Sequence, residues 1–322
     1  MPAYLLIIIL SLLQFQKNVD KTNYYSISVL DKNTAIVCGE NGKIIRTTNG
    51  GKQWISSRFI GRTKNTLYSI HFINSKVGWA VGAYGTILKS TDGGISWKNS
   101  DSSSTYNLMC VRFVNPQTGW IVGSRGLILK TTDGGKNWLR QYSNVTHDLA
   151  SVSFPSSKVG YAVGASGTVI KTTDGGESWF QLNSGYPYFY FSVFFIDTLT
   201  GWLCGGYGSI LHTTDGGEYW EEQNAREYFR YFKTSNFHYS IHFIDHNRGW
   251  LAGNSGTIMS TTDGGNNWTD QISNTEQVLH CLTAYSPSHI WIVGNNGTIL
   301  KTTNGGTDWN FINETSSKTE RR

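Results

Sequence analysis

Seven short motifs place an acidic or amide side chain at regular intervals along the chain, and these side chains are the first candidates for chemistry. The motif reads S/T-x-D/N-G-G-x-x-W, and its third residue is Asp92, Asp133, Asp174, Asp215, Asp263, Asn49 or Asn304. Carboxylates can act in acid–base catalysis or bind calcium. An Asp that precedes Gly-Gly is typical of a tight turn, where the carboxylate accepts backbone N–H bonds. Each Asp also belongs to a separate repeat, so we predict structural turns and no catalytic or metal site.

The motifs are part of a longer repeat. Residues 82–97, 123–138 and 164–179 match one another, and the same frame recurs at 39–54, 205–220, 253–268 and 294–309. The closing tryptophans are spaced by 43, 41, 41, 41, 48 and 41 residues. All 12 Trp of the protein fall at repeat positions, so we interpret them as core residues.

Four short strands fit into one repeat. In the second repeat we expect strands at 68–73, 79–82 and 86–90 and around Trp97, with a tight turn at Ala83-Tyr84, because the apolar residues alternate with period two. Four strands in about 41 residues with no helix is the signature of a propeller blade. The sequence therefore predicts an all-β, seven-bladed β-propeller with four antiparallel strands per blade and the Asp turns between the third and fourth strands. We expect blades one and seven to close the ring by packing, and the four cysteines to be free.

The turn motif resembles the Asp-box of BNR-type propellers. The full frame, G-x-x-G-x-[IVL]-[IVL]-x-[TS]-T-[DN]-G-G-x-x-W with Gly-Trp just upstream, resembles the repeat of the photosystem II stability/assembly factor family over residues 24–312. The resemblance implies a non-enzymatic scaffold that binds a protein partner, such as an assembly intermediate of a membrane complex, outside the cytoplasm. It does not establish that the partner is a photosystem.

A carbohydrate-binding or glycoside hydrolase-type Asp-box propeller is the alternative. Sialidases resemble this repeat too, but they need an arginine cluster and an early [FY]-R-I-P motif, and no Arg-Ile pair here precedes Pro. No nucleophile–base arrangement is evident either. We therefore predict no enzymatic activity, no cofactor and no metal.

The net charge of +5 is scattered, which argues against nucleic acid as a partner. An apolar run at Tyr4–Leu13 matches the core of a signal peptide and is too short to span a bilayer; a buried first strand is the other interpretation. We assign 1–22 to a signal peptide, 23–313 to the propeller and 314–322 to a polar tail. The expectation is a monomer that is exported to the periplasm or the extracellular space, without stable membrane insertion.

One face of the disc collects Tyr and Arg, which are typical of binding hot spots. This face carries the turns between the second and third strands and the connectors between blades. The predicted partner-binding residues are Tyr84, Arg125, Tyr186, Tyr188, Tyr207, Arg226, Tyr228, Arg230, Tyr231 and Lys233. The alternative is that these aromatics fold back as a satellite core.

A basic residue recurs in the third strand of most repeats. The position holds Arg46, Lys89, Lys130, Lys171, His212, Ser260 and Lys301. We favour stems that pack along the neighbouring blade over a charged ring for an acidic partner.

Overall fold

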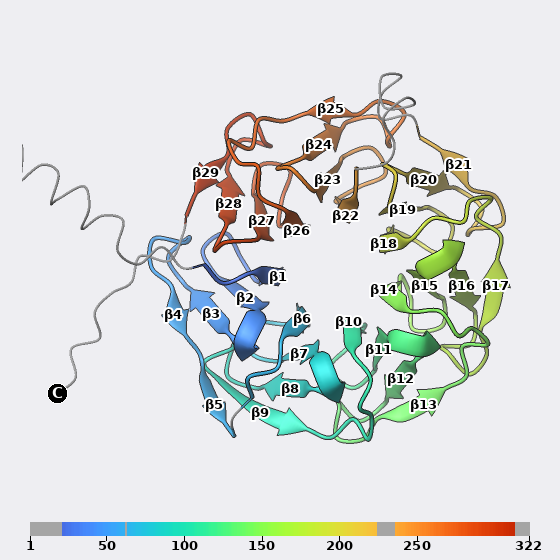
Figure 1. Cartoon of the computed structure of the whole chain (residues 1–322), viewed down its shortest axis with the longest axis horizontal. Coiled ribbons are helices and arrows are strands. Elements are labelled where there is room, and N and C mark those ends of the chain that lie inside the picture. The colour runs from blue at the N-terminus through green and yellow to red at the C-terminus, as the bar shows by residue number, and fades with distance from the viewer. Residues whose placement is uncertain (1–20, 62, 224–235, 313–322) are drawn as a thin grey trace, which may run out of the picture.

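Seven small sheets surround a central channel in the computed structural model of the chain, which describes residues 21–61, 63–223 and 236–312 (Figure 1). Each sheet contains four antiparallel strands in sequence order from the channel outward, and one sheet has a fifth strand at its outer edge. No α-helix occurs within these residues. The predicted seven-bladed all-β propeller is thereby confirmed.

The strands occupy the same four levels in every blade. The innermost strands are β1 (Tyr24–Val29), β6 (Leu67–Phe72), β10 (Leu108–Phe113), β14 (Leu149–Ser153), β18 (Tyr190–Phe195), β22 (His238–Phe243) and β26 (Leu279–Ala284). The second strands are β2 (Ala35–Gly39), β7 (Gly78–Gly82), β11 (Gly119–Gly123), β15 (Gly160–Gly164), β19 (Gly201–Gly205), β23 (Gly249–Gly253) and β27 (Ile290–Gly294). The third strands are β3 (Ile44–Thr47), β8 (Ile87–Ser90), β12 (Ile128–Thr131), β16 (Val169–Thr172), β20 (Ile210–Thr213), β24 (Ile258–Thr261) and β28 (Ile299–Thr302). The outer strands are β4 (Ile55–Ser56), β9 (Ser96–Ser100), β13 (Leu139–Gln141), β17 (Phe180–Leu182), β21 (Glu221–Glu222), β25 (Thr269–Asp270) and β29 (Asn310–Phe311).

The hydrophobic cores lie between consecutive blades, and the tryptophans fill them. Trp79 of β7 stacks face to face on Phe113 of the next blade, with ring centroids 3.4 Å apart, and Phe113 meets Trp138 edge-on at 5.9 Å. All 12 Trp are buried. The interpretation of Trp as core residues is confirmed.

The Asp turn is held by local hydrogen bonds. In blade four, the Thr172 hydroxyl donates to Asp174 Oδ1 at 2.8 Å and accepts from the Gly176 N–H. The backbone N–H and the hydroxyl of Ser178 both donate to the Asp174 carboxylate. These bonds to the ionised form lower the pKa of Asp174, and equivalent bonds lower the pKa of Asp133 to about 2.

The first Gly of every Asp turn also ties its blade to the preceding one. Its backbone carbonyl accepts a hydrogen bond from the preceding blade in all seven interfaces. The donors and acceptors are Arg46 to Gly93, Lys89 to Gly134, Trp120 to Gly175, Lys171 to Gly216, Trp202 to Gly264, Trp250 to Gly305 and Lys301 to Gly50.

The last of these ties closes the ring. Lys301 of blade seven donates to Gly50 of blade one, and Trp54 Nε1 donates to the carbonyl of Ile312 at 2.8 Å. Blade one contains β1–β4 and blade seven contains β26–β29, so no strand is exchanged between them. Closure by packing, as predicted, is confirmed.

Two details differ from the sequence prediction. The segment after blade one forms an extra strand, β5 (Arg58–Ile60), which pairs in parallel with β9 and gives blade two a fifth strand. The predicted two-residue turn of blade two is a 3₁₀ turn, η2 (Ala83–Gly85), with counterparts η1 (Glu40–Gly42), η3 (Ser124–Gly126) and η4 (Ala165–Gly167). All four cysteines are free, as expected.

Candidate functional site

The disc has two faces of different character. On one face, connectors between blades bond to the turns between second and third strands: Tyr84 N–H donates to Asn107 Oδ1, and Arg125 N–H donates to Asp148 Oδ1 at 2.8 Å. We call this the connector face. On the other face, the Asp turns bond to the loops between first and second strands, as in Gly93 N–H to the Lys76 carbonyl. The predicted partition of loops between the faces is confirmed.

The turns of the connector face hold their central residues in a left-handed backbone conformation. Tyr84, Arg125 and Tyr207 have φ of 54°, 58° and 59°. The equivalent residues in the other blades are Asn41, Ser166, Ser255 and Asn296. Large side chains are uncommon in this conformation, and such strain tends to occur where function requires it. Tyr84 is 74% exposed and Tyr207 47% exposed, so both rings face solvent.

A tyrosine cluster forms at blade five. Tyr188 stacks on Tyr186 with centroids 5.5 Å apart and meets Tyr207 at 5.2 Å. Tyr186 and Tyr188 are half-buried against the core between blades four and five. The satellite-core alternative therefore applies in part to Tyr186 and Tyr188, because both rings pack on this core. Tyr207 lies beside them and is exposed.

The remaining predicted residues are distributed differently. Arg125 is exposed and lies over the Tyr106 ring, 5.5 Å from its centroid, apart from the tyrosine cluster. Arg226, Tyr228, Arg230, Tyr231 and Lys233 lie outside the described residues.

The sequence interpretation missed an aromatic arc at the channel mouth. Every innermost strand has a β-bulge, and the bulged residues are Tyr25, Tyr68, Met109, Ala150, Phe191, Tyr239 and His280. A bulge redirects its side chain, and bulges are frequent beside functional sites. The signal was available, because an aromatic side chain precedes the repeated Ser or Cys in five of seven repeats.

Ring contacts connect the arc across five blades. The centroid distances are 5.8 Å for Tyr68–Tyr25, 4.9 Å for Tyr25–His280, 5.5 Å for His280–Tyr239 and 4.9 Å for Tyr239–Phe191. The arc lies toward the connector face, since Tyr25 Oη donates to Glu40 of η1 and His280 Nε2 contacts Asn295 Oδ1 of the last such turn. Burial and the nearby Glu40 charge raise the pKa of Tyr25 to about 12. The arc is therefore an uncharged aromatic rim.

The basic third-strand residues reach the Asp turns of the next blade, on the face opposite the connector face. Lys89 and Lys171 donate to backbone carbonyls of the next blade, and Lys130 pairs with Glu177 at 2.7 Å. The Lys89 ammonium also lies 5.5 Å from the Trp79 ring centroid. The preferred interpretation of packed stems matches these contacts.

The described ranges contain neither a metal-binding cluster nor a membrane-spanning helix. No group of three His, Cys, Asp or Glu side chains in these ranges is arranged to hold a metal ion. No helix in the same ranges has the length and apolarity needed to cross a membrane.

The repeats match one family along nearly the whole chain. The family described as photosynthesis system II assembly factor YCF48 matches residues 12–90, 60–145, 140–227 and 226–318. The chain belongs to this family. None of the curated proteins compared with the YCF48-family chain matches it.

Solved structures share the fold of this YCF48-family chain. "YCF48 bound to D1 peptide" is 21% identical, with 88% of this chain and 93% of that chain covered and a TM-score of 0.74. YCF48 from Cyanidioschyzon merolae is 18% identical, with 88% and 96% covered and a TM-score of 0.71. A GH74 xyloglucanase from Xanthomonas campestris is 12% identical, with 92% and 55% covered and a TM-score of 0.72. At these identities the structural likeness shows the fold alone.

Proposed function

We propose that the chain is a non-enzymatic scaffold that binds a segment of a partner protein on its connector face. The aromatic arc carries this proposal, because it is a continuous rim of half-buried rings across five blades at the mouth of the channel. Aromatic side chains are enriched at protein interfaces, where they bury a large area at low entropic cost. The likeness to a YCF48 structure bound to a D1 peptide supports a peptide segment as the ligand.

The tyrosine cluster extends the arc outward at blade five. Phe191 of the arc stacks on Phe189 of the preceding connector, with centroids 4.6 Å apart, and Tyr188 is the residue directly before Phe189 in the same connector. A bound segment would thus cross from the channel mouth to Tyr207 along aromatic side chains. The partner we propose is an extracytoplasmic segment of a membrane protein during assembly, and the protein would act after export.

The function is tested by cross-linking in cells and mass spectrometry of what is attached, comparing the parent with two variants. Tyr239→Met removes an arc ring, and Met is tolerated because Met109 holds the equivalent bulge. Tyr207→Asn removes the outer ring, and Asn is tolerated because Asn41 and Asn296 hold the equivalent left-handed turn. The variant that carries both Tyr239→Met and Tyr207→Asn should recover about tenfold less partner, the loss typical of a hot-spot residue.

Tyr219→Asn is the matched control. Tyr219 belongs to blade five, as Tyr207 does, and is 69% exposed, but it lies in the Asp turn on the opposite face. Partner recovery should equal that of the parent. Equal recovery by the double variant would refute the binding face, and recovery of glycan without protein would favour the carbohydrate-binding alternative.

A further inference from the structure

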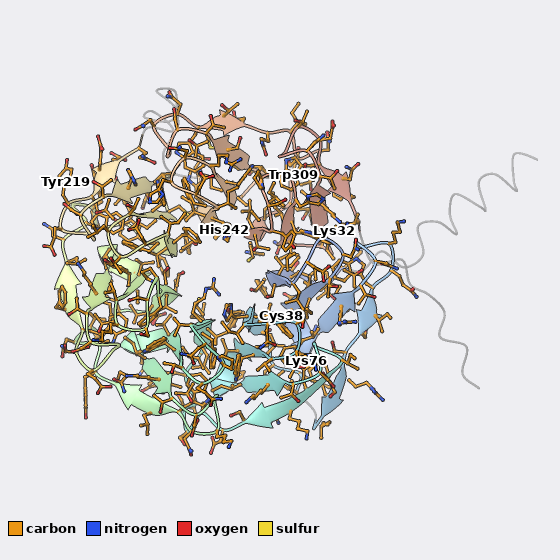
Figure 2. The ribbon with its side chains drawn as sticks, turned by 180° about the vertical axis from the view of Figure 1, so that it is seen from behind. Lys32, Cys38, Lys76, Tyr219, His242 and Trp309 are labelled. Atoms are coloured by element: carbon orange, nitrogen blue, oxygen red, sulfur yellow. The ribbon has the colours of Figure 1, made fainter. Side chains whose placement is uncertain are left out.

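A second ring of side chains lines the channel beyond the aromatic arc. It consists of the residue two positions after the repeated Ser or Cys in each innermost strand. Its members are Ser28, His71, Arg112, Ser153, Phe194, His242 and Thr283. They are half-buried and border a cavity of about 380 Å³. Figure 2 shows His242 at the edge of the central opening.

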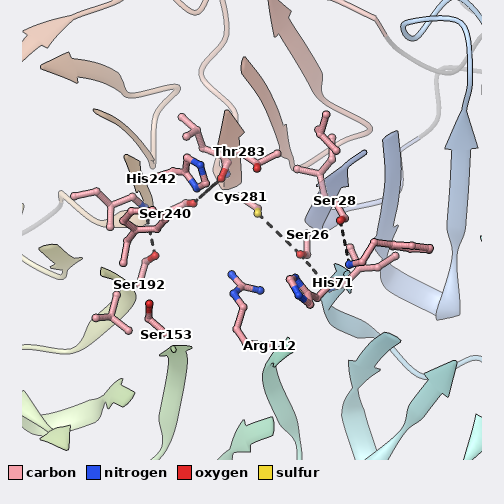
Figure 3. Close-up of a pocket in the computed structure, with 18 of the residues that line it drawn as sticks. Ser26, Ser28, His71, Arg112, Ser153, Ser192, Ser240, His242, Cys281 and Thr283 are labelled. Atoms are coloured by element: carbon pink, nitrogen blue, oxygen red, sulfur yellow. Dashed lines mark hydrogen bonds between the residues drawn. The ribbon is translucent and has the colours of Figure 1, made fainter. Parts of the chain in front are cut away.

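Arg112 is the charged centre of this cavity. Its guanidinium points into the middle of the cavity between His71 and Ser153 (Figure 3). Its hydrogen bond within the described residues runs from Nη1 to the Val111 carbonyl at 3.0 Å. The described residues that line the cavity include no Asp or Glu. A cation in a partly desolvated channel without a counterion is costly unless an anion occupies the site.

Hydroxyl groups line the same cavity as the guanidinium. Ser28 Oγ accepts from Phe72 N–H at 3.2 Å, and Ser153 Oγ accepts from Phe195 N–H at 3.1 Å. These bonds use hydroxyl lone pairs, and neither hydroxyl hydrogen has an acceptor among the described side chains and backbone. The Thr283 hydroxyl has no hydrogen-bond partner there either. Three O–H groups are therefore available to donate into the cavity.

The two histidines add no competing negative charge. His71 Nε2 lies 3.2 Å from the Phe113 carbonyl of the next blade, and His242 bonds to the backbone of Ala284 in the same way. Burial, helped by the Arg112 charge, lowers the pKa of His71 to about 3 and that of His242 to about 4. Both rings are neutral at pH 7, so the positive charge of the cavity belongs to Arg112.

We propose that the channel binds a small oxyanion, a phosphate or carboxylate group, through Arg112 and the hydroxyls of Ser28, Ser153 and Thr283. The planar guanidinium provides the paired N–H donors that such groups accept. Ser153 comes from the neighbouring blade, and Ser28 and Thr283 come from across the channel, so donors reach the anion directly or through water. The site is separate from the aromatic arc and does not depend on the partner proposed above.

Calorimetric titration of the full chain with sodium phosphate and with sodium acetate tests the proposal, with sodium chloride at equal ionic strength as the reference. The parent should bind one of the two oxyanions saturably. Arg112→Gln should weaken that binding about tenfold or more, as expected for loss of a charged hydrogen bond. Arg140→Gln is the matched control, because Arg140 is exposed on β13 at the outer edge of the same blade. It should bind as the parent does.

The phosphate titration and the acetate titration together identify the chemical class of the ligand. Binding of phosphate points to a phosphoryl group, and binding of acetate points to a carboxylate. No binding above the chloride reference, or equal binding by Arg112→Gln, would overturn the proposal. If Arg112→Gln fails to fold, the imidazole resonances of His71 and His242 in the parent decide. They should shift saturably with the oxyanion, and the proposal is wrong if they do not.

Discussion

The Lys89 ammonium of blade two donates to the backbone carbonyl of Gly134 in blade three at 2.7 Å. Because β7 also supplies Trp79, two donors compete for this carbonyl, and Trp79 Nε1 is left without a hydrogen-bond partner. In blades three, five and six the Trp makes the bond instead. Gly264 and Gly305 also accept a second hydrogen bond, from Gln223 and Gln271 of the preceding blade. Every interface therefore ties this carbonyl, but the identity and number of its donors change from blade to blade.

Replacing Lys89 with Met should destabilise the propeller by about 1–2 kcal/mol, because the variant keeps the packed stem and loses a charged hydrogen bond. Lys130→Met is the control. Lys130 pairs with the exposed Glu177, and a surface pair contributes about 0–1 kcal/mol. Urea unfolding measures both. Equal effects of the two substitutions would show that the Gly134 bond does not stabilise the ring.

Asp174→Ala should lower the free energy of unfolding by about 1–2 kcal/mol, since the N–H of Ser178 and the hydroxyl of Thr172 lose their acceptor. Asp174→Asn should cost less, because Asn49 and Asn304 accept the same bonds in their own turns. Chemical denaturation measures the two variants. If both are as stable as the parent, the carboxylate does not hold the turn; loss of partner binding at unchanged stability would indicate a binding role.

Ser69→Ala should destabilise by about 1–3 kcal/mol. The Ser69 hydroxyl accepts from the buried N–H of Val111 in the next blade at 3.2 Å, and an unpaired buried N–H costs this much. Ser69→Cys should fall between Ala and the parent, because Cys110 and Cys281 occupy the equivalent position elsewhere. Thermal unfolding ranks the stability of the parent and the two variants. A Ser69→Ala variant as stable as the parent would contradict the prediction.

The channel histidines should make the protein less stable in mild acid. The titratable side chains that line the cavity are His71, Arg112, His242 and Cys281. The pKa is about 3 for His71 and about 4 for His242 in the folded chain, below about 6.5 in the unfolded chain. The unfolded state therefore binds these protons first, so their contribution to stability is complete above pH 6.5 and is lost progressively as the pH falls toward 4 and 3.

NMR titration of the imidazoles checks this directly. Both resonances should remain those of neutral rings at pH 5.5. In Arg112→Gln both pKa values should rise, because the Arg112 charge is one cause of the lowering in each. Titration of either ring near pH 6.5 in the parent would show that the channel does not bury it.

The repeat allowed the fold to be predicted because the same residue types recur at the same structural position. Trp97 and its equivalents identify the turn before the outer strand, and the alternation around Ser69 identifies the innermost strand. The exposed Tyr84 and Tyr207 were also predictable, since two residues between Gly positions leave little alternative to a turn. The strand β5 was not, because Arg58–Ile60 departs from the repeat and pairs in parallel with the outer strand of the following blade.

The group of side chains that meet in the channel could not be predicted from the sequence, for a different reason. Arg112 and His242 are 130 residues apart in the sequence, and each is one residue of an ordinary alternating strand. They face each other only because seven strands converge on one axis, which no local pattern specifies. The aromatic arc also depends on the β-bulges at Tyr25 and Tyr239, because a bulge redirects the side chain of the extra residue.

Closure between blades seven and one uses the same kind of contact as every other interface, with Lys301 donating to Gly50 as Lys89 donates to Gly134. Each blade is also built from one uninterrupted stretch of sequence. The order in which the blades are synthesised is therefore not needed to define the ring. A circularly permuted chain that starts at β14 and reaches blade three last would contain every strand pairing and every interface tie of the natural one.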